Sequence, residues 1–177
     1  MARGEKLSFT QDDLTINGHS LEIRVYAEDP QNDFLPDIGK LEVYKIPEGE
    51  NVRVDHALEE GMDIPIYYDP MISKLIVHAE NRDLAISKMI KAIDDYDIVG
   101  VKTTLPFCKY AIDHKAFRSG DFDTRFVNLY FNETEVLNPN DEINHASVVG
   151  LFHLNKMDLI SQNNIPSKSS DWKKNRS

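Results

Sequence analysis

The chain has 177 residues, of which 41% are hydrophobic and 28% are charged, and its formal net charge is −10. These values fit one globular domain with a core, or one such domain followed by a tail. The acidic charge argues against nucleic-acid binding, which needs a basic surface, and no apolar run approaches the ~20 residues of a membrane-spanning helix.

The amino terminus and the cysteine content indicate the compartment. Residues 1–6 are polar and contain no apolar segment, so we expect no secretory signal peptide. Cys108 is the only cysteine, which rules out a disulfide within the chain and favours a reducing cytoplasm. Its place on the apolar stripe of a predicted helix indicates a small core residue, not a nucleophile.

The first half of the chain has the pattern of short strands. Residues 1–17 are a polar lead-in, and from Gly18 on the side chains alternate between apolar and polar. The apolar ones are Leu21, Ile23 and Val25, and the polar ones are Glu22, Arg24 and Tyr26. This alternation predicts a strand with one face on a core. Further strands are predicted over residues 39–44, 52–55 and 71–78, with turns between them, which indicates an antiparallel sheet.

The second half changes to a helical period. Asn81 is a favourable N-cap, and the apolar residues from Ala85 to Tyr96 recur with the spacing of one helix face. A short strand is predicted over residues 98–101. Thr104 is the expected cap of a second helix, and Phe122–Phe131 is predicted as a third. The fold class is therefore α+β, with an antiparallel β-sheet flanked by a few helices.

The chain divides into three parts by composition. Residues 1–17 are the lead-in from an upstream region, and residues 18–131 form the domain. Residues 132–177 begin as an acidic linker, contain a possible helix over 147–160, and end in a serine-rich tail that we expect to be mostly disordered.

A self-contained active site is not evident in the sequence. The glycines are scattered singly, so no glycine-rich turn cradles a phosphate, and no serine lies in a nucleophile elbow. The six histidines lack the spacing of metal ligands. We therefore assign no metal and no cofactor to this chain alone.

Four residues stand out as candidates. Arg24 places a guanidinium on the polar face of a strand, where it could bind a carboxylate or bicarbonate or stabilise an oxyanion. The alternative is a surface ion pair with Glu22. Tyr68 and Asp69, next to Tyr67, could orient a substrate group. The alternative there is an Asp-Pro turn with tyrosines half-buried in the core.

Arg53 is the fourth candidate. It lies between two valines in a predicted strand and points away from their apolar face. It is either solvated or part of an interface, where arginine is enriched.

An ordered series of motifs resembles the C-terminal domain of biotin carboxylase, from the α subunits of propionyl-CoA and acetyl-CoA carboxylases. The series lies within residues 4 to 131. Its runs are Gly18–Pro30, Phe34–Pro36 with Gly39-Lys40, Val52–Asp55, Tyr67–Ile76, Gly100–Thr103 and Phe117–Thr124. An ordered series is far more specific than any single motif.

The resemblance implies a reaction in which ATP activates bicarbonate and a carboxyl group passes to biotin held on a carrier domain. The family has an ATP-grasp fold, and this chain resembles only its last domain. ATP, Mg (or Mn) and their ligands would then belong to upstream domains, and the chain alone would bind none of them.

The resemblance also implies roles for the candidates. Arg24 matches an arginine that lines the biotin site and stabilises negative charge on the biotin ureido oxygen. Tyr68 and Asp69 match a motif near that site, and Arg53 matches a position at the homodimer interface of bacterial members.

The implied partners are the upstream ATP-grasp domains, the biotin carboxyl carrier domain and a carboxyltransferase subunit. The expected function is to complete the biotin site and the dimer surface, with no activity alone. The competing hypothesis is a docking or dimerisation module with no catalytic contribution, and the two differ at Arg24.

Overall fold

The computed structural model describes residues 3–65 and 67–131. The chain divides into two units, Met1–Val136 and Leu137–Ser177, and the described residues all belong to the first. The predicted linker, the possible helix over 147–160 and the tail therefore lie outside the described residues, and they stay predictions.

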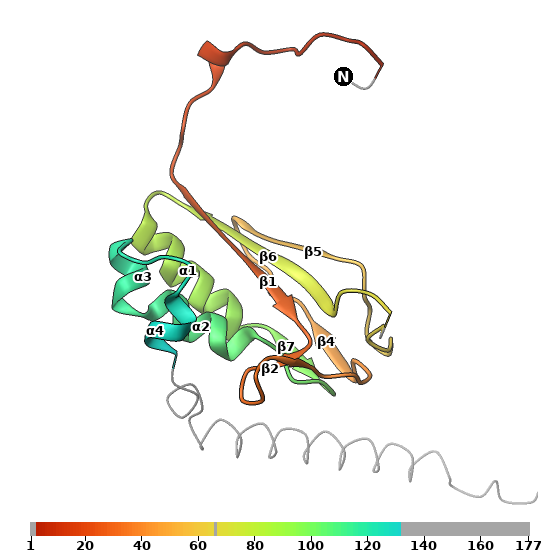
Figure 1. Cartoon of the computed structure of the whole chain (residues 1–177). Helices are drawn as coiled ribbons and strands as arrows, with labels where there is room; N and C mark the ends of the chain where they lie inside the picture. Colours follow the sequence, from red (N-terminus) through yellow and green to blue (C-terminus); the bar gives the residue numbers. More distant parts are fainter. Residues whose placement is uncertain (1–2, 66, 132–177) are drawn as a thin grey trace, which may run out of the picture. The chain divides into compact units, whose positions relative to one another are not determined.

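An antiparallel sheet is the frame of the domain (Figure 1). Strand β6 (Met71–Ala79) lies between β1 (His19–Tyr26) and β5 (Val52–His56). The three strands predicted over these segments are confirmed, and so is the α+β class with an antiparallel sheet. From Ser73 to Ala79 of β6, side chains are alternately buried and partly exposed, as the two-residue period of a strand requires.

Two short ladders extend the frame. Strand β2 (Glu28–Asp29) pairs with β3 (Leu35–Pro36), and β4 (Val43–Lys45) pairs with β7 (Asp97–Val99). The strand predicted over residues 39–44 is therefore shorter than expected. Its first part instead joins a neighbouring loop through the single bridge between Lys40 and Asp63.

Helices cover one face of the sheet (Figure 1). They are α1 (Arg82–Asp94), α2 (Leu105–Asp113), α3 (Lys115–Ser119) and α4 (Phe126–Tyr130). The predicted cap of α1 is confirmed, because the Asn81 side chain accepts a hydrogen bond from the Leu84 amide at 3.0 Å.

The prediction of one helix over Phe122–Phe131 is wrong in its first half, because the helix begins only at Phe126. The Asp123 side chain accepts a hydrogen bond from the Arg125 amide at 2.8 Å, which holds a turn before α4.

Helix α3 is not evident from the sequence pattern. It begins where the His114 side chain accepts a hydrogen bond from the Ala116 amide at 3.2 Å. It ends at Gly120, whose φ of +80° is in the left-handed region. Histidine is not a usual cap, so the start of this helix has no clear signal in the sequence.

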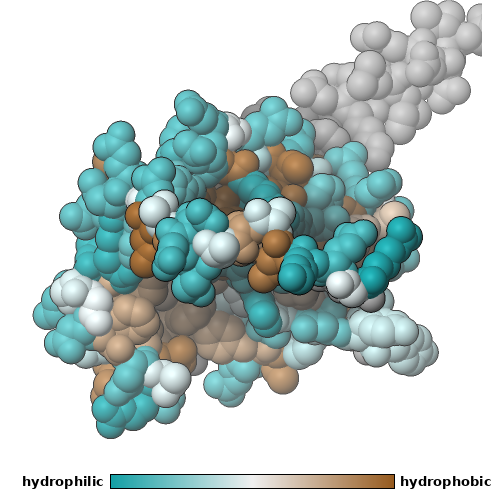
Figure 2. Space-filling model, turned by 90° about the horizontal axis from the view of Figure 1, so that it is seen from above, coloured by the Kyte–Doolittle hydropathy of each residue, from teal (hydrophilic) through white to brown (hydrophobic). Residues whose placement is uncertain are grey.

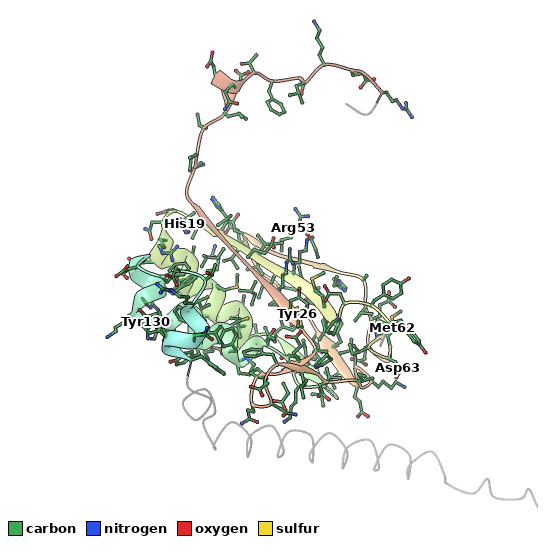
Figure 3. All side chains as sticks on the ribbon, in the orientation of Figure 1. His19, Tyr26, Arg53, Met62, Asp63 and Tyr130 are labelled. Carbon is green, nitrogen blue, oxygen red and sulfur yellow. The ribbon has the colours of Figure 1, made fainter. Side chains whose placement is uncertain are left out.

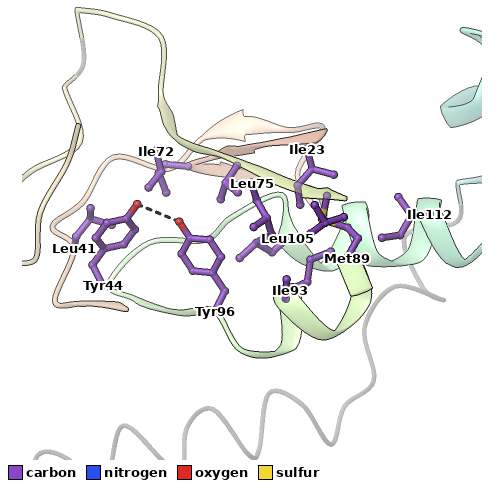
Figure 4. Close-up of a cluster of buried hydrophobic side chains, with 14 of the residues drawn as sticks. Ile23, Leu41, Tyr44, Ile72, Leu75, Met89, Ile93, Tyr96, Leu105 and Ile112 are labelled. Atoms are coloured by element: carbon purple, nitrogen blue, oxygen red, sulfur yellow. Dashed lines mark hydrogen bonds between the residues drawn. The ribbon is translucent and has the colours of Figure 1, made fainter. Parts of the chain in front are cut away.

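The core lies between the sheet and α1 (Figure 4). The largest fully buried side chains of the domain are Val25, Leu41, Ile72, Leu75, Val77, Ile86 and Met89. Within it, the Tyr96 hydroxyl makes hydrogen bonds of 2.8 Å to Ser73 and 3.1 Å to Tyr44. Burial raises the pKa of Tyr96 well above its ordinary value, so the phenol stays neutral.

Cys108 packs against this core, as the sequence predicts. Burial raises the pKa of its thiol to about 11, so the reactive thiolate is scarce at neutral pH.

The lead-in contains one regular element among its described residues, the short 3-10 helix η1 (Gln11–Asp13). Residues 3–17 are exposed throughout. Among all the described residues, no helix is both long and apolar enough to cross a membrane. The face of the molecule in Figure 2 is largely hydrophilic, with hydrophobic residues in small separate groups.

Candidate functional site

Arg24 lies on the open face of the sheet. Its neighbours Ile23 and Val25 are buried, while Arg24 itself is exposed and stands opposite Lys74 of β6. Because successive side chains of a strand point to opposite faces, burial of the two apolar neighbours directs Arg24 away from the helices. The expected position of this arginine on the polar face is confirmed.

The backbone that carries Arg24 is held on both edges. On one edge β1 pairs with β6. On the other, the Thr104 hydroxyl accepts a hydrogen bond from the Tyr26 amide at 3.1 Å and donates one to the Arg24 carbonyl at 3.4 Å. The Thr104 amide also donates to the Tyr26 carbonyl at 3.1 Å. These contacts on both sides fix the strand in position.

Thr104 occupies the N-cap position of α2, as predicted, but its side chain does not act as the cap. Its side chain makes no capping hydrogen bond to α2. The hydroxyl is used by β1 instead, and the residue is only 5% exposed. No local pattern could signal this contact, because Thr104 and Arg24 are 80 positions apart.

The surroundings of Arg24 favour its charged form. The neighbouring Tyr26 side chain, and then the charges of Glu22 and Asp69, raise the pKa of the guanidinium. Among the described residues, Glu22 and Arg24 do not form an ion pair. The alternative of a simple Glu22–Arg24 pair is therefore not what the structure contains.

Glu28 belongs to the same cluster and is not among the predicted candidates. Partial burial, and then the charge of Asp69, raise the pKa of its carboxyl. A signal is present in the sequence, because Glu28 continues the two-residue series of Glu22, Arg24 and Tyr26. The cluster thus has one guanidinium facing phenol and carboxylate groups.

Asp69 starts the turn that leads into β6. Its carboxylate accepts a hydrogen bond from the Met71 amide at 3.1 Å, as an Asp-Pro turn does. Tyr67 and Tyr68 are 88% and 81% exposed, so the alternative that placed both rings half in the core is wrong. Of this motif, Asp69 is the residue whose charge acts on Arg24.

Arg53 lies on the edge strand β5, on the side of the sheet away from the helices (Figure 3). Its guanidinium donates two hydrogen bonds to Asp55, at 2.8 and 2.9 Å, and 73% of its side chain is exposed. This pair raises the pKa of Arg53 and lowers that of Asp55. The guanidinium of Arg53 remains exposed, so a partner can reach it.

The acidic and imidazole side chains of the domain do not gather into a metal site. Within residues 3–65 and 67–131, no three His, Cys, Asp or Glu side chains are placed to hold a metal ion. These residues therefore do not fit Mg²⁺, whereas the guanidinium of Arg24, with Lys74 opposite it on β6, is suited to an anion or oxyanion.

Comparison with known proteins places these residues in a family. The profile of the biotin carboxylase C-terminal domain matches residues 22–129. A pyruvate carboxylase subunit of Methanothermobacter thermautotrophicus is 48% identical over 130 residues, which are 73% of this chain and 26% of that protein. The mitochondrial propionyl-CoA carboxylase alpha chain of Caenorhabditis briggsae is 43% identical over 129 residues, which are 72% of this chain and 18% of that protein.

Solved structures of biotin carboxylases are also similar to this chain. The biotin carboxylase domain of a thermophilic 2-oxoglutarate carboxylase, bound to bicarbonate, has a TM-score of 0.70 at 44% identity, and the match covers 72% of this chain and 29% of that one. The biotin carboxylase subunit of a pyruvate carboxylase has a TM-score of 0.72 at 39% identity, with coverage of 76% and 29%. The chain thus spans under a third of the length of these proteins.

Proposed function

Because the chain belongs to the biotin carboxylase C-terminal domain family, we propose that it acts as the last domain of a biotin carboxylase in a biotin-dependent acyl-CoA carboxylase. The complete component carboxylates carrier-bound biotin with ATP and bicarbonate. The observation that carries the proposal is Arg24: a permanent cation on a strand whose backbone is held on both edges.

Arg24 would act on the ureido oxygen of biotin. When N1′ of biotin loses its proton, negative charge develops on that oxygen, and it leaves the oxygen again when N1′ forms the bond to the carboxyl carbon. A guanidinium already fixed in position stabilises this charge with little reorganisation. Arg24 is open to water in the described residues. Upstream ATP-grasp domains would therefore have to close over it, and they would also hold ATP and Mg (or Mn).

Tyr68 and Asp69 would support the same step. The charge of Asp69 reaches Arg24, so its carboxylate can orient the guanidinium. The exposed Tyr68 side chain can reach a group that enters from outside the domain. Both are supporting roles, because neither residue provides a fixed positive charge.

Arg53 would lie at a homodimer interface. Its exposed fork next to Asp55 presents both signs of charge, which suits a contact between two identical copies. A dimer of the biotin carboxylase domain of Hydrogenobacter thermophilus 2-oxoglutarate carboxylase is among the similar structures. The carrier domain and a carboxyltransferase subunit complete the proposed set of partners.

The proposed location is the cytoplasm, which the single cysteine supports. We further propose that the acyl-CoA substrate of the whole enzyme is propionyl-CoA or acetyl-CoA, because the sequence motifs resemble the carboxylases that act on these two compounds. The relatives are named for pyruvate, 2-oxoglutarate and propionyl-CoA. What these proteins share by family is the biotin carboxylase step, and our proposal rests on that step.

The test uses the chain joined to the ATP-grasp domains from the same protein. Arg24→Ala should lower kcat for biotin-dependent ATP cleavage by about a hundredfold, as loss of an oxyanion donor does elsewhere. Arg24→Lys should retain part of the native kcat, because lysine keeps the positive charge but lacks the planar guanidinium with its several donors. Arg125→Ala is the matched control, since Arg125 pairs with Asp123 just before α4 and not with the Arg24 cluster.

If Arg24→Ala behaves like Arg125→Ala, the domain is a docking module and the catalytic role is wrong. In the same protein, Arg53→Ala should increase the monomer fraction in sedimentation.

A further inference from the structure

Asn17 and Gly18 form the only Asn-Gly pair in the sequence, and they join the exposed lead-in to strand β1. We infer that Asn17 is a site of spontaneous deamidation and backbone isomerisation, and that His78 promotes the reaction. The inference is independent of the proposed function, because it depends on local geometry alone.

The reaction needs no agent other than water. The backbone nitrogen of Gly18 attacks Cγ of Asn17, the bond from Cγ to the side-chain nitrogen breaks, and the Gly18 proton leaves with that nitrogen as ammonia. Water then opens the resulting succinimide on either side. One opening gives aspartate, and the other gives isoaspartate, in which the backbone runs through the former side chain.

The fold requires the glycine that makes this attack easy. Gly18 has a φ of +72°, in the left-handed region that favours glycine. A Cβ at this position would lie 2.3 Å from the Ala79 carbonyl oxygen and 2.7 Å from Nε2 of His78. Any larger residue is therefore excluded, and the nitrogen after Asn17 keeps the least hindered approach.

His78 contacts the peptide that must lose its proton. Its Nε2 lies 2.7 Å from the carbonyl oxygen of Asn17. Since a carbonyl oxygen can only accept, Nε2 is the donor. When the Gly18 nitrogen is deprotonated, part of the negative charge moves to that same carbonyl oxygen. The hydrogen bond stabilises this charge, as donors in an oxyanion hole do.

The side chain of Asn17 is free to react. The residue is exposed, and over residues 3–65 and 67–131 its side-chain amide makes no hydrogen bond. Asn81 is the contrast, because its side-chain oxygen is held by the Leu84 amide at 3.0 Å. Asn81 is also followed by an arginine, whose side chain hinders the attacking nitrogen.

The product would change the start of β1. Both products add a negative charge beside His78, and isoaspartate adds one carbon atom to the backbone. This change falls two residues before His19, which forms the first ladder pair of β1 with Ala79. The same strand carries Arg24, so the modification alters the anchor of the strand that holds the candidate site.

The experiment incubates the full 177-residue chain at mildly alkaline pH and follows peptides by mass spectrometry, with isoaspartyl methyltransferase labelling. We expect a gain of one mass unit at Asn17 well before Asn81, an equal release of ammonia, and methyl labelling of the same peptide. Asn17→Gln should abolish the labelling. His78→Leu should slow the reaction several-fold in the folded chain.

A second comparison covers the case in which His78→Leu does not fold. The native chain should deamidate at Asn17 at least as fast folded as in urea, where the hydrogen bond is lost. Equal rates for folded His78→Leu and the native chain, a slower folded than unfolded rate, or no preference for Asn17 over Asn81 would each overturn the inference.

Discussion

Gly100 is the residue at which the backbone leaves the least room. Its φ is +107°, and a Cβ there would lie 2.0 Å from the Lys40 carbonyl oxygen. Gly120 also has a positive φ, of +80°, but a Cβ on it would meet no atom within 4 Å. A larger residue at position 120 would therefore cause backbone strain alone, whereas one at position 100 would cause backbone strain and a steric clash.

Alanine at each position tests this difference. Gly120→Ala should lower the free energy of unfolding by about 1 kcal/mol, the cost of a left-handed alanine. Gly100→Ala should cost at least about 3 kcal/mol, because strain and a backbone clash add. Urea unfolding followed by circular dichroism measures both. Similar losses at the two positions would mean that the crossing of residues 40 and 100 is looser than described.

Residue roles could be predicted where a local pattern fixed them. The alternation from Leu21 to Tyr26 placed Arg24 on the polar face, because burial of one set of side chains decides the direction of the other. Local pattern failed for Tyr67 and Tyr68, which lie in a turn with no period, so their aromatic character alone suggested burial. The roles of Arg24, Tyr68, Asp69 and Arg53 in a reaction or an interface remain proposals.

Among the elements, β1 depends most on a contact distant in sequence. It is an edge strand, so the backbone groups on its outer side need partners outside the sheet. Thr104, just before α2, provides them through its hydroxyl and its amide. The start of α2 is thereby fixed against the strand that carries Arg24.

Replacement of the hydroxyl tests this link. Thr104→Val keeps the shape but leaves the Tyr26 amide without its acceptor, so the free energy of unfolding should fall by about 1–3 kcal/mol. Thr104→Ser keeps the hydroxyl, so its free energy of unfolding should fall clearly less than that of Thr104→Val. Thermal or urea unfolding gives the comparison. If the Thr104→Val and Thr104→Ser variants are equally stable, the hydroxyl does not hold the edge of β1.

The elements themselves were predictable to the extent that their signals were local. The buried strand β6 and the amphipathic helix α1 have strong periods over 9 and 13 residues. Helices α3 and α4 have 5 residues each, too short for a period, and a histidine cap and an aspartate turn set their limits. Such limits depend on side-chain hydrogen bonds that a hydrophobic pattern does not record.

At the scale of the whole domain, helices cover one face of the three-stranded sheet, and none of the described helices lies on the other face (Figure 1). The charges on the open face include Arg24 and Arg53. Within the described residues no His, Cys, Asp or Glu side chains gather into a metal site, and our proposal assigns ATP and its metal to upstream domains. This arrangement supports a domain that completes an active site formed with other domains.

The most direct test compares ATP cleavage, with bicarbonate and biotin present, by three samples: the 177-residue chain, the ATP-grasp domains from the same protein, and the two joined. We predict that only the joined protein shows a biotin-dependent rate. Biotin-dependent cleavage by the chain alone would mean that it contains the whole site. An equal rate from the ATP-grasp domains without the chain would mean that Arg24 completes nothing, and either result would contradict our account.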